Sequence, residues 1–143
     1  MYITKKEFGK PIRNDGSEAF RQCVMDYCLK TKEMPIRISK EDVEDLINDK
    51  SISVIFERGC SLDEMTDRLP VNSERFSECI LKMVYLKYNP DNRPTIEEIQ
   101  DRNGLVELFD NTENPIWGLA ADDSVDIKME MMIAYCPKVV VRP

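Results

Sequence analysis

Carboxylates are the most numerous of the residues in this chain that could do chemistry. Its 143 residues include 27 Asp and Glu, 20 Lys and Arg, and no histidine. The missing histidine removes the commonest general base, together with the Ser–His and Cys–His nucleophilic pairs. An enzyme would therefore have to use carboxylates, Lys, Tyr or a lone Cys. We keep a small carboxylate enzyme as the third hypothesis and expect a non-enzymatic protein.

The five cysteines do not have the spacing of a metal site or of a disulfide framework. Asp122, Asp123 and Asp126 offer oxygen atoms to a hard cation, but they lack the Gly and the distal Glu of an EF-hand loop. We therefore expect no metal and no cofactor. The N-terminal residues do not resemble a secretory signal and no apolar run could span a bilayer, which predicts a cytoplasmic protein with reduced thiols.

Acidity is concentrated in residues 95–130, where ten acidic and two basic side chains give a charge of −8, against −7 for the whole chain. A binding face for a basic protein is the functional interpretation, and a solvated surface is the ordinary alternative. The only tryptophan, Trp117, lies within this segment and is either an interface anchor or a core residue. The predicted partner-binding residues are Glu97, Glu98, Asp101, Glu107, Trp117, Asp122 and Asp123.

A second pattern covers residues 52–88. Gly59 and Ser61 come before a run in which apolar residues recur at the spacing of a helix. Phe76, Ile80 and Met83 follow at the spacing of another helix. The residues of the whole pattern are Gly59, Ser61, Leu62, Met65, Leu69, Phe76, Ile80 and Met83. The pattern resembles the helix-turn-helix of winged-helix proteins, which implies a DNA-binding transcriptional regulator. Under that alternative the residues contacting nucleic acid are Asn72, Ser73, Arg75 and Lys82. Residues 59–88 nevertheless hold five acidic and four basic side chains, a balance that repels phosphates.

The elements around these residues follow from periodicity and capping. Ser17 begins a helix that Pro35 ends, and its apolar face holds Phe20, Cys23, Val24, Tyr27 and Cys28. Ser39 and Thr95 begin two further acidic helices, and residues 73–87 are predicted to form a central buried helix. Residues 52–59 could be strand or helix. Alternation over 125–135 favours a strand, followed by a turn at 136–137 and a second strand over 138–141.

These patterns predict one α+β domain over residues 1–143, mostly helical, with a helix-turn-helix-like three-helix centre and a small C-terminal β element. The functional expectation is an acidic binding protein that engages, and inhibits or regulates, a basic protein that handles nucleic acids. Inhibitor or immunity proteins of phages and bacteria have this size and charge, which is an analogy of composition only.

Overall fold

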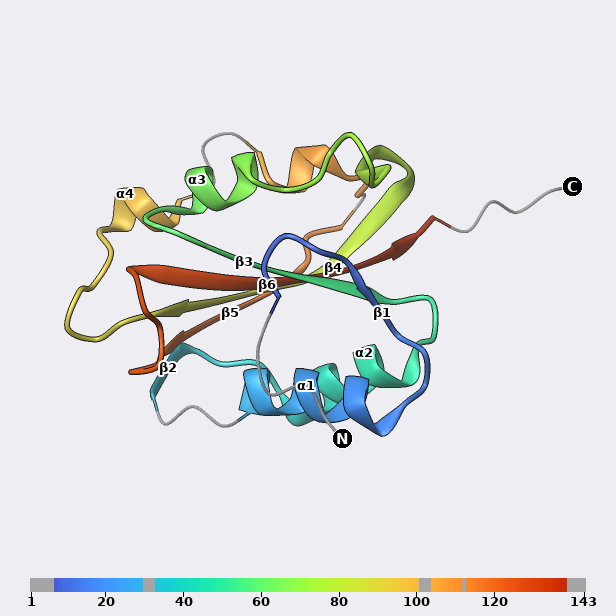
Figure 1. The fold of residues 1–143 in the computed structure, drawn as a ribbon, viewed down its shortest axis with the longest axis horizontal. Coiled ribbons are helices and arrows are strands. Elements are labelled where there is room, and N and C mark those ends of the chain that lie inside the picture. Colours follow the sequence, from blue (N-terminus) through green and yellow to red (C-terminus); the bar gives the residue numbers. More distant parts are fainter. Residues whose placement is uncertain (1–6, 30–32, 101–103, 112, 139–143) are drawn as a thin grey trace, which may run out of the picture.

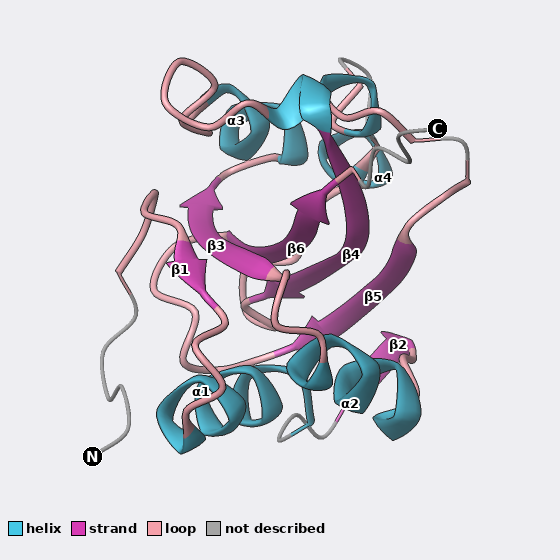
Figure 2. Ribbon diagram, turned by 90° about the vertical axis from the view of Figure 1, so that its right-hand side faces the viewer, coloured by secondary structure: helices cyan, strands magenta, loops and turns pink. Residues whose placement is uncertain are grey.

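A six-stranded mixed sheet lies between two layers of helices in the computed structural model of the chain (Figures 1 and 2). The structure describes residues 7–29, 33–100, 104–111 and 113–138. The strands are β1 (Ile12–Arg13), β2 (Glu33–Ile36), β3 (Ser53–Gly59), β4 (Cys79–Tyr88), β5 (Ile116–Ala121) and β6 (Met129–Pro137). The helices are α1 (Glu18–Leu29), α2 (Lys40–Asn48), α3 (Leu62–Asp67) and α4 (Ile96–Ile99), with 3-10 turns η1 (Phe76–Glu78) and η2 (Val106–Leu108).

The strand order is β1-β3-β6-β4-β5-β2, so the last strand of the chain lies near the middle of the sheet. β4 and β5 run parallel, whereas the other neighbouring strands in this order are antiparallel. A parallel pair needs a long crossover, because the chain must return to the same end of the sheet. Residues 89–115 make that return and include α4 and η2.

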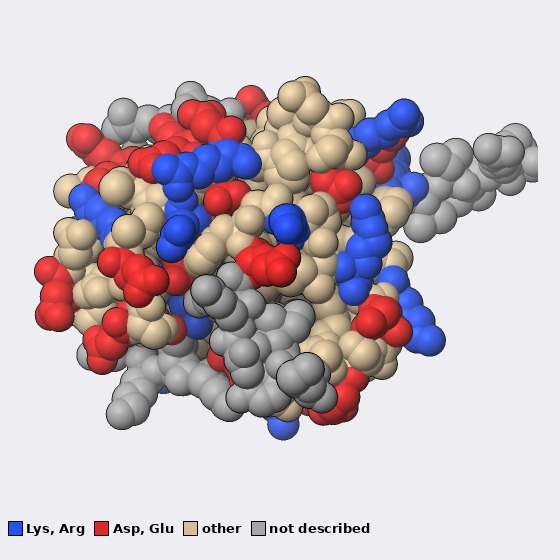
Figure 3. Space-filling view, in the orientation of Figure 1, with Lys and Arg blue, Asp and Glu red and all other residues tan. Residues whose placement is uncertain are grey.

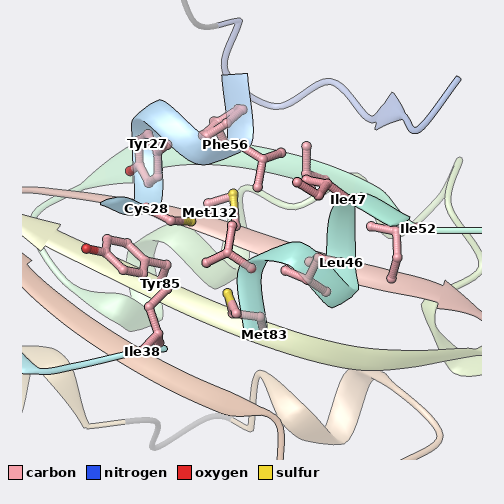
Figure 4. Close-up of a cluster of buried hydrophobic side chains, with 14 of the residues drawn as sticks. Tyr27, Cys28, Ile38, Leu46, Ile47, Ile52, Phe56, Met83, Tyr85 and Met132 are labelled. Atoms are coloured by element: carbon pink, nitrogen blue, oxygen red, sulfur yellow. The ribbon is translucent and has the colours of Figure 1, made fainter. Parts of the chain in front are cut away.

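Each face of the sheet has its own apolar core. α1 and α2 cover one face, where Tyr27, Phe56, Tyr85 and Met132 pack together (Figures 2 and 4). The short helices and 3-10 turns cover the other face, around residues such as Met65. Strands β3, β4 and β6 are therefore covered on both faces. Most of their side chains are apolar, which is typical of strands that are covered on both faces.

The prediction of a mostly helical domain is wrong, because residues 79–87 of the expected central helix lie in strand β4. Their apolar residues cover more than one helical stripe. In a strand the same run fits burial on both faces, and periodicity alone does not distinguish a short buried strand from a buried helix. Residues 52–59, left open between strand and helix, contain strand β3.

The helix-turn-helix-like centre is also wrong. Residues 52–88 fold as strand, short helix, 3-10 turn and strand. Only α3, which Ser61 caps through the Glu64 amide, matches a helix of the expected motif. A recognition helix is absent from this described segment, because the residues that would build it pair with β5 and β6.

The C-terminal strand is confirmed over Met129 to Tyr135, but it is a central strand rather than a small peripheral element. Cys136 and Pro137 continue β6 where a turn was predicted, and residues 139–141 of the second predicted strand lie outside the described residues. The three helices predicted to begin at Ser17, Ser39 and Thr95 are present as α1, α2 and α4. The first ends at Leu29, however, since residues 33–36 form β2.

Candidate functional site

A hollow of about 240 Å³ lies between α2 and the first residues of β4 and β5. α2 supplies carboxylates to its wall from Asp42 and Asp45, and Asp49 follows directly after the helix. Spacings of three and four residues bring these side chains to one side of the helix. The remaining lining residues are Leu46, Ile52, Lys82 and Ile116. Three carboxylates on one wall thus border an aliphatic floor.

The floor of the hollow is the rim of the core under α2. Leu46 and Ile52 are buried and belong, with Met83, to the cluster drawn in Figure 4. Ile116, at the start of β5, is 38% exposed, which is unusual for a large aliphatic side chain of a central sheet. An apolar surface of this kind favours the stem of a bound side chain, and the carboxylates above it favour a positive end.

Two of the carboxylates are held in place by local hydrogen bonds. Asp42 closes a capping box with Ser39, whose hydroxyl accepts from the Asp42 amide at 3.0 Å. Oδ1 of Asp49 accepts from the Ser51 hydroxyl at 2.6 Å and from the Ser51 amide at 2.9 Å. The hydrogen bonds from Ser51 lower the pKa of the Asp49 carboxyl. Burial acts against this decrease, and the positive charge of Lys82 adds to it. Asp49 therefore keeps its charge further into acid than an ordinary aspartate.

Lys82 reaches the hollow because β4 is irregular at this point. The pairing of β4 with β6 shifts between Leu81 and Met83, which leaves Lys82 as the extra residue of a bulge. Lys82 was predicted to contact nucleic acid, and its charge instead lies close enough to Asp49 to lower that carboxyl's pKa. One ammonium among three carboxylates leaves the hollow negative.

Some of the predicted partner-binding residues meet at the opposite end of the sheet. Glu98 in α4 forms a 2.6 Å ion pair with Lys128, which ties α4 to the segment before β6. Asp122 follows β5 and pairs with Lys87 at 3.0 Å. Their neighbours Glu97 and Asp123 are exposed at the same end. Glu98 and Asp122 are thus engaged within the molecule.

The other predicted partner-binding residues are not part of that group. Glu107 lies in η2, and Trp117 lies in β5 near the strand end opposite to Asp122. Trp117 is half-buried and packs against the core under α3 and the 3-10 turns, which fits its alternative interpretation as a core residue. Asp101 lies outside the described residues.

The residues predicted for DNA contact do not form a recognition surface. Asn72 and Ser73 are exposed in the turn before η1, and Arg75 pairs with Glu78 at 3.7 Å. On the face drawn in Figure 3, Lys and Arg are interspersed with Asp and Glu. A duplex needs several unopposed cations against its phosphates, and this face does not offer them.

A second group of titratable residues is buried beneath α1. The Lys87 ammonium lies 3.8 Å from the centre of the Tyr27 ring, and the Tyr27 hydroxyl donates to Oε1 of Glu130 at 3.3 Å. Glu130 is the cross-strand partner of Lys87, and both side chains are 4% exposed. Burial raises the pKa of Tyr27, and the Glu130 charge raises it further. The group is enclosed by packed side chains, so we interpret it as structural.

Sequence reasoning missed the carboxylates of the hollow. The spacing of Asp42, Asp45 and Asp49 was a visible signal, but acidic residues at the start of a helix have an ordinary explanation in the helix dipole. Ile116 and Lys82 carried no signal, because only the pairing of β4 with β5 and β6 brings them to α2. Among the described residues, no three of His, Cys, Asp or Glu are grouped in a way that could hold a metal ion.

No family model matches the chain, and a search of the curated proteins finds no match either. In the part of the chain that the structure describes, none of the helices is long and apolar enough to cross a membrane. The function is therefore argued from the geometry of the hollow and the charge of the surface.

Proposed function

We propose that the protein is a non-enzymatic binding protein that takes a basic segment of a protein partner against the α2 hollow. One observation carries the proposal: three carboxylates border an aliphatic floor in a concave part of the surface. A lysine or arginine side chain has matching chemistry, because its apolar stem can cover Ile116 while its charged end approaches the carboxylates.

The class of partner follows from the same chemistry. Proteins that handle nucleic acids present Lys and Arg to phosphates, so their binding surfaces are basic. An acidic protein that covers such a surface would compete with the nucleic acid for it. This competition would inhibit or regulate the partner. The net charge of −7 supports fast association with a basic surface, an attraction that salt weakens.

The test uses a fluorescently labelled peptide rich in Arg and Leu, with a Glu-for-Arg peptide as its control, and measures anisotropy at low and at physiological salt. Asp45→Lys reverses an exposed carboxylate of the hollow, whereas Asp123→Lys makes the same change at the opposite end of the sheet. We expect Asp45→Lys to weaken binding by about tenfold or more and Asp123→Lys to leave it nearly unchanged.

The two variants have the same net charge, so a difference between them reports location rather than total charge. Equal losses would show that only the overall field matters, and a larger loss for Asp123→Lys would move the site to the sheet end. The absence of saturable binding to the Arg-Leu peptide at low salt would contradict the proposal.

A further inference from the structure

Glu57 is a buried acidic residue within strand β3. The residue is 5% exposed, and its Oε2 atom has no hydrogen-bond partner among the described residues. A buried polar atom without a partner costs about 1–3 kcal/mol, and an ionised one costs more. Native structures contain few such atoms, so each of them has a structural or functional reason.

Residues 7–10, which we call the strap, run along the outer edge of β3 beside this carboxyl. Phe8 forms a parallel bridge with Phe56, and the Gly9 amide donates to the Phe56 carbonyl at 2.8 Å. Gly9 has a φ of +80°, and a Cβ atom built there would lie 3.5 Å from Oε2 of Glu57. The strap backbone therefore lies against the unpartnered oxygen, in a conformation that favours glycine.

The strap is attached to β3 by few hydrogen bonds, and its Phe8 is a partly buried side chain at the border of the core under α1 and α2. Besides the Gly9 hydrogen bond, the Arg58 guanidinium lies over the Phe8 ring, 4.7 Å from its centre. β1, which continues from the strap, pairs with β3 over two residues only, Ile12 and Arg13. A segment held by so few hydrogen bonds opens at a lower free energy than the core strands do.

The charged groups around the carboxyl are already engaged with others. Arg68, after α3, donates to the Arg58 carbonyl at 2.6 Å and to Glu64 at 2.7 Å. The charged residues on the elements packed here are Arg58 on β3, Asp63, Glu64 and Asp67 on α3, Arg68 directly after α3, and Glu7 and Lys10 on the strap, which pair with each other at 3.8 Å. Burial raises the pKa of Glu57 above its ordinary 4.5, while the Arg58 amide and the charges of Arg68 and Arg58 oppose that rise.

We propose that the strap is a proton-controlled cover of the outer edge of β3, with the Glu57 carboxyl as the titrating group. With the carboxyl neutral, closure buries no charge. With it ionised, closure buries a carboxylate oxygen without a partner, and opening the strap returns that oxygen to water. The closed form binds the proton more tightly, so closure strengthens as pH falls through the Glu57 pKa and weakens above it.

Opening of the strap has a defined structural consequence. It releases the Phe56 carbonyl and the neighbouring backbone groups of β3, which is a long strand of the sheet. An uncovered edge strand can accept another strand through its free backbone groups. The cover thus controls access to an edge that is distinct from the α2 hollow, and it does not depend on the proposed function.

The test is native-state hydrogen exchange of the Gly9 amide followed by NMR, corrected for intrinsic exchange, from neutral pH down to the ordinary glutamate range near pH 4.5. We expect its protection factor to rise as pH falls, by up to about tenfold per pH unit. Glu57→Gln is neutral at every pH, so its Gly9 protection should be high and independent of pH. Glu7→Gln removes an exposed carboxyl of the strap and should keep the dependence of the unmodified protein.

An amide of β6, such as that of Met132, reports global unfolding in the same spectra. Parallel changes at Gly9 and Met132 would show that pH acts on the whole fold and would overturn the proposal. A Gly9 protection factor that does not change with pH in the unmodified protein would overturn it without any variant. A dependence that persists in Glu57→Gln would do the same.

Discussion

Tyr135 donates a 2.5 Å hydrogen bond from its hydroxyl to Oε1 of Glu74, which joins the central strand β6 to the turn before η1. Glu74 also accepts from Arg13 at 3.3 Å, and Arg13 donates to the Ser53 hydroxyl at 3.0 Å. This network connects β6, the η1 turn and both strands at one edge of the sheet. Burial of Tyr135 raises its pKa, and Glu74 raises it further, so the hydroxyl keeps its proton throughout the physiological range.

Tyr135→Phe should therefore lower the free energy of unfolding by about 1.5–3 kcal/mol, because it removes a hydrogen bond to a charged acceptor. Urea unfolding followed by the fluorescence of Trp117 measures the loss. Tyr88→Phe is the matched control, since Tyr88 is also buried but its hydroxyl forms no hydrogen bond with another described residue. A loss at Tyr88 as large as that at Tyr135 would contradict the role given to the hydroxyl.

Asp122→Asn should cost about 2–4 kcal/mol, because it leaves the nearly buried Lys87 without its 3.0 Å carboxylate partner. Asp123→Asn changes an exposed neighbour and should stay within about 0.5 kcal/mol of the unmodified protein. Urea titration of both variants at neutral pH checks the difference. Similar values for the two would show that Lys87 is compensated by other groups.

The Lys87–Asp122 pair also predicts the response to acid. Burial acts to raise the pKa of Asp122, but hydrogen bonds from Ser124 and the charge of Lys87 outweigh it, so the pKa is lowered below 3.8. The stability from this carboxylate is present above pH 3.8 and is lost as pH falls through the lower folded-state pKa. The difference in stability between the protein and Asp122→Asn should therefore shrink in strong acid.

Gly118→Ala should destabilise the sheet by about 1–3 kcal/mol through overpacking. A Cβ atom at this position of β5 would lie 2.8 Å from Cδ2 of Tyr85 and 2.9 Å from Cγ2 of Ile38. The Tyr85→Leu variant removes the ring, so the cost of Gly118→Ala should be smaller in that background. A double-mutant cycle measures this coupling, and purely additive losses would contradict the steric explanation.

None of the five cysteines, all of which lie within the described residues, forms a disulfide in the structure, and their reactivities should differ with their surroundings. Cys60 is exposed, whereas Cys28 is buried on α1, and burial raises the pKa of its thiol to about 12. Thiol titration of the native protein at neutral pH should show a fast phase that Cys60→Ser removes. Cys28 should react only as slowly as the protein unfolds, and a rapid reaction at Cys28 would show that α1 opens locally.

The sequence alone determined the helices that depend on neighbouring residues. Ser39 with Asp42 and Thr95 with Glu98 form the capping boxes that begin α2 and α4, and the apolar face of α1 follows its periodicity. Such features lie within one or two turns of chain, so the residues that cause them are adjacent in sequence.

Only the tertiary structure decided what residues 79–88 become. The run is apolar enough to be a buried helix, and it is a strand because its partners, β5 and β6, are distant in sequence and pair with it across the sheet. The candidate site has the same origin. α2 supplies its carboxylates locally, but Lys82 and Ile116 join them through non-local strand pairing, which is why the hollow could not be read from the spacing of residues.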